Sequence, residues 1–150
     1  MAEAVTVKFD DSEVQAWLSQ LGESAKDAVR PASQAGAEVL YREVLARVPV
    51  STEGHWFYGT NQKYYFEAGT LRKSIYQVFS EDNSTGLKAT YHVAWNHRKA
   101  PYGFMVEFGT SRAKAKPFLR PAYDAKVQAS LDAAKTVFFE RVQEKVGGLQ

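Results

Sequence analysis

The last third of the chain repeats apolar side chains at every third or fourth position, a spacing that places them on one face of a helix. The series comprises Leu119, Tyr123, Val127, Leu131, Ala134, Phe138 and Val142. It follows Pro117, which suits a first helical turn because its φ is already helical and the missing N–H would be unpaired there anyway. We therefore expect a helix over residues 117–146, spanning roughly 40 Å at 1.5 Å per residue.

A second periodic series lies nearer the N-terminus and predicts a helix over about 31–48. Its members are Ala25, Val29, Ala32, Gly36, Leu40, Val44 and Val48. Pro49 ends this helix. Pro31 leaves two alternatives, because a proline inside a helix removes one hydrogen bond. The helix begins near Arg30 with Pro31 in its first turn, or it continues through Pro31 with a kink.

Two shorter elements are predicted before this helix. Alternating apolar residues at 5–9 are typical of a strand. Asp11 and Ser12 are suitable helix caps, and apolar residues follow at helical spacing as far as Leu21. We expect Gly22 to end that short helix.

Aromatic residues crowd the segment 51–68 without a sustained period. They are Trp56, Phe57, Tyr58, Tyr64, Tyr65 and Phe66. Gly59-Thr60-Asn61 separates the two aromatic triplets and is typical of a hairpin tip, so the segment reaches about 30 Å if each half is extended. We expect a projecting arm that contacts a neighbouring subunit, since aromatic residues are enriched in interface cores. The alternative is a satellite hydrophobic cluster that lies against the domain.

The middle of the chain predicts a pair of strands. The first covers 71–80 and follows Gly69, and the second covers 87–97 and has the clearest alternation in the sequence. Residues 82–86 form the turn between them. We expect an antiparallel sheet, which the strand at 5–9 can extend. The sequence thus predicts an α+β fold in which this sheet packs against two long helices, as one domain over 1–150 with the arm inserted at about 51–68.

The segment 102–110 fits two periods. Tyr102, Met105 and Val106 share a helical face, whereas Phe104, Val106 and Phe108 alternate as in a strand. We favour a short helix capped by Gly109.

Nothing in the sequence is typical of an enzyme. His55, His92 and His97 do not have metal-ligand spacing, and the chain contains no Cys. It also lacks a nucleophile elbow, a phosphate-binding loop and a dinucleotide fingerprint. We expect no catalytic residue, no cofactor and no metal.

Glu107 is the one carboxylate that stands among apolar neighbours. A lone carboxylate of this kind is more often a capping or ion-pair partner than a general base. Arg112 or Arg120 is the expected mate if it forms an ion pair.

Basic residues cluster between Arg98 and Arg120. Apart from Arg120, they are Arg98, Lys99, Arg112, Lys114 and Lys116. The net charge of +2 is too small to indicate nucleic-acid binding by itself. A charge run is usually a solvated loop. The sharper hypothesis is a basic rim that faces DNA once copies are arranged in a ring.

Four short motifs together resemble a known family. They are Val48-Pro49-Val50; Gly69, Leu71, Arg72, Ser74 and Ile75 as Gly-x-Leu-Arg-x-Ser-Ile; Tyr102 to Thr110 as Tyr-x-x-x-Val-Glu-Phe-Gly-Thr; and Pro117-Phe118-Leu119-Arg120-Pro121-Ala122. Their order, over roughly 24–146, resembles that of the small phage tail components typified by gene product ten of a lambdoid coliphage. Many members pass from the first motif to the second almost directly, so the arm is a departure from that pattern.

The resemblance implies a virion protein of a long-tailed phage that completes the tail or joins it to the head, as a ring around the DNA channel. A hexamer matches tail symmetry and is favoured, and a dodecamer matches a portal-side position. The implied partners are copies of this chain, other neck and tail proteins, and channel DNA. We interpret the motif residues as structural first, namely Pro49, Gly69, Leu71, Arg72, Glu107, Phe108, Gly109, Pro117, Phe118, Arg120 and Pro121.

No apolar run approaches the roughly 20 residues of a membrane span, and the N-terminus does not resemble a signal peptide. We therefore expect no membrane partner, and a location in the host cytoplasm during assembly and in the virion afterwards.

Two other functional classes stay open. One is a DNA-binding module that uses residues 98–120, for which strongly salt-dependent affinity is diagnostic. The other is an unrecognised hydrolase centred on Glu107 and the histidines, for which the diagnostic result is activity lost in Glu107→Gln with folding intact.

Overall fold

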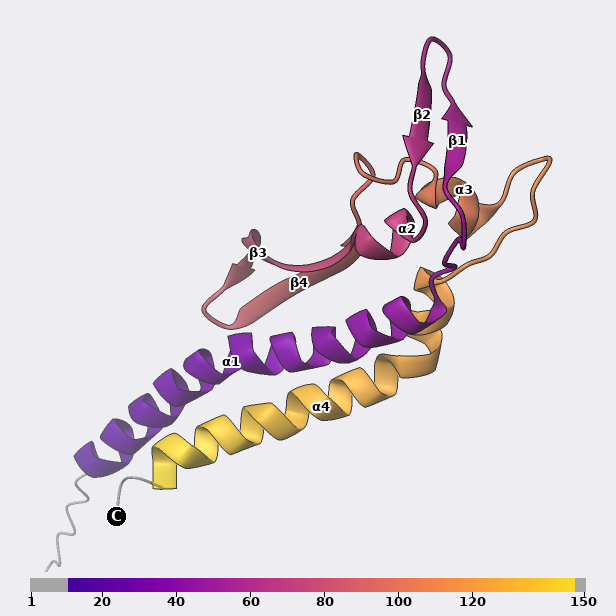
Figure 1. The fold of residues 1–150 in the computed structure, drawn as a ribbon. Coiled ribbons are helices and arrows are strands. Elements are labelled where there is room, and N and C mark those ends of the chain that lie inside the picture. Colours follow the sequence, from indigo (N-terminus) through magenta and orange to yellow (C-terminus); the bar gives the residue numbers. More distant parts are fainter. Residues whose placement is uncertain (1–10, 148–150) are drawn as a thin grey trace, which may run out of the picture.

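The computed structural model describes residues 11–147 and has an α+β fold. In chain order its elements are α1 (Ser12–Arg47), β1 (His55–Tyr58), β2 (Lys63–Phe66), α2 (Thr70–Lys73), β3 (Ile75–Thr85), β4 (Lys88–Trp95), α3 (Gly103–Phe108) and α4 (Leu119–Gly147). The two long helices lie side by side, and the β3–β4 hairpin lies on the other side of α1 (Figure 1). The β1–β2 hairpin projects from the end of the molecule where α2 and α3 lie (Figure 1).

The N-terminal half of the fold is a single helix of 36 residues, α1. The prediction that Gly22 ends a short helix was wrong, and so was a start near Arg30. The helix continues through Pro31, the second alternative, and Figure 1 shows it bending near its middle. A glycine costs a helix only about 1 kcal/mol relative to alanine, which the packing of α1 against α4 outweighs. The strand predicted at 5–9 lies outside the described residues.

Small side chains let the two long helices approach closely. Ala28, Ala32, Gly36 and Ala37 are buried along α1. A Cβ on Gly36 would lie 3.0 Å from the backbone oxygen of Ser130, and the Ser130 hydroxyl donates a hydrogen bond of 2.8 Å to the Gly36 carbonyl. This contact fixes the register of α1 on α4.

The predicted antiparallel sheet is the β3–β4 pair, and the β1–β2 hairpin forms a second, separate antiparallel pair. In the β3–β4 pair Ile75 faces Trp95 and Ser80 faces Thr90, with a register irregularity between Ser80 and Thr85. The strand prediction over 71–80 was wrong at its start, because residues 70–73 form α2. The turn is shorter than the predicted 82–86, because β3 extends to Thr85 and only two residues separate it from β4.

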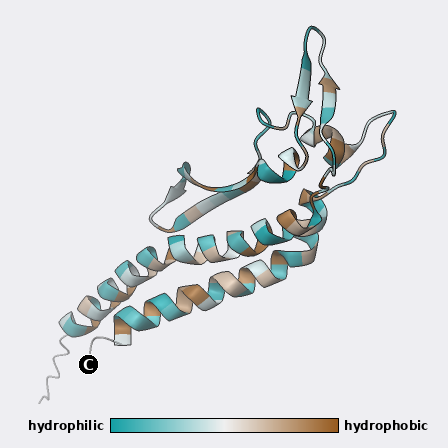
Figure 2. Cartoon of the chain, viewed as in Figure 1, coloured by the Kyte–Doolittle hydropathy of each residue, from teal (hydrophilic) through white to brown (hydrophobic). Residues whose placement is uncertain are grey.

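The hydrophobic core lies at one end of the helix pair. Its buried residues are Val44, Val48, Leu71, Ile75, Ala100, Tyr102, Phe118 and Ala122. Among residues 11–147 the largest fully buried side chain is Phe118, whose ring centroid lies 5.9 Å from that of Trp95. Figure 2 shows apolar residues concentrated on α3 and the start of α4, and mixed with polar residues along the long helices.

Candidate functional site

The junction of α3 and α4 is organised by one carboxylate. Glu107 is 6% exposed and accepts hydrogen bonds from the backbone N–H groups of Phe118 (2.7 Å), Leu119 (3.1 Å) and Arg120 (3.2 Å). Pro121 has no N–H, so Glu107 accepts from every N–H between residues 118 and 121. A carboxylate at a helix N-terminus also interacts favourably with the helix dipole.

The capping role expected of Glu107 is therefore confirmed. The expected alternative, an ion pair with Arg112 or Arg120, is not. No salt bridge within residues 11–147 joins it to Arg112 or Arg120, and Arg120 contributes its backbone rather than its guanidinium. The helix begins at Leu119, so the expectation that Pro117 occupies the first turn was wrong. Pro121 takes that place, where its missing donor costs nothing.

A tight reversal after α3 brings the basic loop back onto that helix. Gly109 has a φ of 77° and donates its N–H to the carbonyl of Met105, so it caps α3 as expected. A Cβ at this position would lie 2.7 Å from the backbone nitrogen of Ala115, a clash only glycine avoids. The N–H of Lys116 then donates to the Val106 carbonyl at 2.8 Å.

The basic side chains are exposed but divided between two loops. Arg98 and Lys99 lie between β4 and α3, whereas Arg112, Lys114 and Lys116 lie between α3 and α4. Figure 1 shows these loops on opposite sides of α3. On a single copy the basic residues therefore come from two separate loops.

The β1–β2 hairpin is the arm predicted at 51–68, and its tip lies where Gly59-Thr60-Asn61 predicted it. His55 pairs with Phe66, Trp56 with Tyr65, Phe57 with Tyr64 and Tyr58 with Lys63. Because side chains alternate across a strand, this register separates an inner face from an outer face. The inner face carries His55, Phe57, Tyr64 and Phe66, and the outer face carries Trp56, Tyr58, Lys63 and Tyr65.

The inner face fixes the arm to the core. The rings of His55 and Phe66 lie 4.7 and 5.0 Å from that of Tyr102, and Phe57 packs at the edge of the core cluster. Burial raises the pKa of Tyr102, with a backbone hydrogen bond to Leu71 acting in the opposite direction. The satellite-cluster alternative therefore describes this face of the arm.

Within residues 11–147 the outer face has no comparable contact with the core. Trp56 is 57% exposed, Tyr58 68% and Tyr65 56%. Trp56 and Tyr65 contact one another at 5.2 Å, and the Lys63 ammonium lies 5.2 Å from the centre of the Tyr58 ring. The aromatic surface thus continues across both strands.

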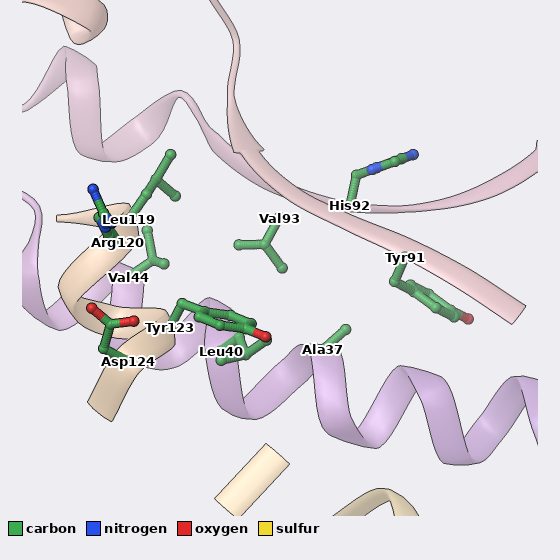
Figure 3. A pocket seen from close by; sticks show the side chains of 10 residues that line it. All are labelled: Ala37, Leu40, Val44, Tyr91, His92, Val93, Leu119, Arg120, Tyr123 and Asp124. Atoms are coloured by element: carbon green, nitrogen blue, oxygen red, sulfur yellow. The ribbon is translucent and has the colours of Figure 1, made fainter. Parts of the chain in front are cut away.

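Sequence reasoning missed an open groove between β4, α1 and the start of α4 (Figure 3). Its volume is about 650 Å³ and its lining comprises Ala37, Leu40, Val44, Tyr91, His92, Val93, Leu119, Arg120, Tyr123 and Asp124. Aliphatic side chains from all three elements form its floor, and Arg120 and Asp124 stand at its α4 side (Figure 3). The regular helical spacing of Leu40, Leu119 and Tyr123 suggested only core positions, so the sequence carried no signal for it.

Sequence reasoning also missed an exposed aromatic pair on α3. Phe104 is 60% and Phe108 65% exposed, and their rings lie 4.7 Å apart. Phe108 was interpreted as structural, but its side chain faces outward. The strand-like alternation of Phe104, Val106 and Phe108 was the sequence pattern that could have drawn attention to this pair.

The histidines are dispersed over the arm, the groove and the loop after β4. Between residues 11 and 147 no group of three or more His, Cys, Asp or Glu side chains is placed to hold a metal ion. None of the helices in this range combines the length and hydrophobicity needed to span a bilayer. Comparison with protein-family models, curated proteins and solved structures finds no match to the chain.

Proposed function

We propose that this chain is a structural subunit that assembles in several copies as a ring at the head-to-tail junction of a long-tailed phage. It completes the tail or joins it to the head, around the DNA channel. Six copies match the symmetry of a tail, and twelve match a portal-side position. Its partners are further copies of the chain and the adjoining neck and tail proteins.

The observation that carries this proposal is the amount of surface one copy leaves uncovered. The chain exposes 11310 Å², whereas a compact monomer of 16.8 kDa exposes about 7,700 Å². An allowance of about 2,000 Å² for the thirteen residues outside the described range still leaves an excess of well over 1,000 Å². Large exposed aromatic side chains occur on the arm, on α3 and on α4. Surface of this kind is typical of proteins that are completed by neighbours.

The four family-like motifs add independent support. Six of the eight buried core residues belong to them: Val48, Leu71, Ile75, Tyr102, Phe118 and Ala122. The motif residue Glu107 also caps the helix that the motif residue Phe118 precedes. The resemblance therefore rests on residues that define the core of this fold, which is what a shared architecture requires.

The deciding experiment is cryo-electron microscopy of intact phage particles that encode this chain, with mass spectrometry of the same particles. We expect density for a ring at the junction into which α1, α4 and the arm fit, with a countable symmetry. Particles that lack the polypeptide, or a purified chain with a measurable turnover, would contradict the proposal.

A further inference from the structure

We infer that the groove between β4, α1 and α4 receives the outer face of the arm from a second copy of this chain. The inference rests on the proposed function and deepens it, because it names the contact that joins one subunit to the next. The exposed aromatic surface of the arm and the apolar groove then complete one another.

The arm of a copy does not fill that copy's own groove. His55 and Phe66 fix the base of the arm against Tyr102. From there the hairpin points away from the two long helices, whereas the groove lies between those helices and β4 (Figure 1). An arm can therefore occupy only the groove of another molecule.

The chemistry of the two surfaces is complementary. Exposed Trp56, Tyr58 and Tyr65 match an aliphatic floor, on which large flat rings bury apolar area with little loss of rotamer freedom. Charges match as well. The Lys63 ammonium stands on the outer face, and the Asp124 carboxylate at the groove has no ion pair within residues 11–147.

Arg120 supplies a second attraction. Its side chain also lacks an ion pair among the described residues, and it stands at the α4 side of the groove, as Asp124 does (Figure 3). A guanidinium in that position can lie over the face of an incoming aromatic ring.

The area involved is appropriate for a subunit contact. Aromatic side chains bury about 150–250 Å² each when fully covered. Three that are more than half exposed, together with Lys63 and the exposed tip, supply several hundred Å², a large part of the ~800 Å² per partner of a standard interface. Because arm and groove are different surfaces, each copy gives one and receives one, and such a head-to-tail contact forms a ring when the rotation from copy to copy closes.

Disulfide trapping tests the contact. Because the chain contains no Cys, every disulfide that forms joins cysteines introduced by substitution. We expect the full chain carrying both Lys63→Cys and Asp124→Cys to form a ladder of covalent multimers under mild oxidation. Peptide mass spectrometry should identify the link between positions 63 and 124. Each single variant stops at a dimer. The matched control, Lys63→Cys with Ala129→Cys, places the second cysteine at an exposed position on α4 outside the groove and gives no ladder.

Charge reversal gives a second readout that does not depend on oxidation. Light scattering of Lys63→Asp and of Asp124→Lys should show self-association weakened about tenfold or more, and the double variant should recover most of it. Both side chains are exposed, so neither change threatens folding.

The possible results separate this contact from the proposed function. A chain that self-associates without a 63–124 link, or without rescue in the charge-swapped double variant, overturns the contact and leaves ring assembly in place. A chain that stays monomeric even at about 1 mM, the weak end of specific association, also overturns it. The particle experiment then decides the proposed function on its own.

Discussion

The junction of α3 and α4 and the outer face of the arm use similar residues in opposite ways. At the junction an aromatic ring, Phe118, is fully buried, and a charged side chain, Glu107, has its oxygens engaged by backbone donors. On the arm Trp56 and Tyr58 are more than half exposed, and the Lys63 ammonium lies over the exposed Tyr58 ring.

The difference shows where a fold ends and an assembly surface begins. Satisfied polar groups and buried rings hold one chain together, so their loss is measured as a change in the free energy of unfolding. Exposed rings contribute little to that quantity, and their loss is measured as a change in association.

Phe118→Ala should have the largest effect on stability. It removes the largest fully buried ring and its edge contact with Trp95, for which we expect a loss of about 3–5 kcal/mol. Urea denaturation measures it. Phe139→Ala is the matched control, because that ring is 62% exposed and its loss should cost less than about 0.5 kcal/mol. Equal losses in both variants would mean that the core is not where the structure places it.

Glu107→Ala should cost about 2–3 kcal/mol. The change leaves the N–H groups of Phe118 and Leu119 without partners in a buried setting. Glu107→Gln retains one acceptor oxygen and should lose about half as much. Glu23→Ala, which removes an exposed carboxylate paired with Lys26, serves as the control and should cost less than about 0.5 kcal/mol.

The same pair of Glu107 variants addresses the hydrolase alternative. A capping residue that is neutralised changes the unfolding transition of the chain. A general base that is neutralised changes a turnover while the unfolding transition stays in place. If Glu107→Gln leaves stability untouched and abolishes an activity, the interpretation of this junction as purely structural is wrong.

Two glycines with positive φ differ in how strongly the backbone conformation and the surrounding atoms exclude a side chain. At Gly69 (φ 73°) an added Cβ finds its nearest atom at 3.8 Å, so Gly69→Ala should cost about 1 kcal/mol through the left-handed conformation alone. At Gly109 (φ 77°, ψ 178°) the backbone lies in a region that is essentially restricted to glycine, and the Cβ would also meet the backbone of Ala115, so Gly109→Ala should cost more, about 2–3 kcal/mol. Thermal or urea unfolding of the two variants side by side makes the comparison. An equal cost would show that the loop after α3 moves aside easily.

Gly22→Ala should stabilise the chain by about 0.5–1 kcal/mol. Gly22 lies inside α1, and no described atom beyond its neighbours in the same helix comes within 4 Å of an added Cβ, so alanine improves helix propensity without a clash. A rise in the urea midpoint with an unchanged slope is the expected result. A loss of stability would indicate that α1 does end near Gly22, as the sequence alone suggested.

That disagreement over Gly22 illustrates which parts of the fold the sequence could predict. Period alone located most of α4 and the strand from Lys88 to Trp95, whereas the segment of α3 fitted two periods and the favoured short helix is the one observed. It failed where contacts distant in sequence decide. Gly22 and Pro31 both favour helix ends locally, but α4 packs along α1 and keeps it continuous.

The candidate surfaces were predictable to different degrees. The sequence predicted the arm because Gly59-Thr60-Asn61 separates two aromatic triplets. The register of the two strands then determines which rings point outward. The groove could not be predicted, because it exists only where β4, α1 and α4 diverge. Residues such as Leu40 and Tyr123 have the same periodicity whether a neighbouring element covers them or not.

The smallest effect on stability is expected on the arm, and it is the sharpest test of the comparison. Tyr58 is 68% exposed and its ring contacts Lys63 near the tip, so Tyr58→Ala should change the free energy of unfolding by less than about 0.5 kcal/mol. Phe66→Ala is the contrasting variant on the same hairpin. Its ring packs against Tyr102 at 5.0 Å, so its loss should destabilise the chain by about 2 kcal/mol. Denaturation that finds Tyr58 as costly as Phe66 would place the outer face in the folding core and remove the reason to regard it as a surface for a neighbour.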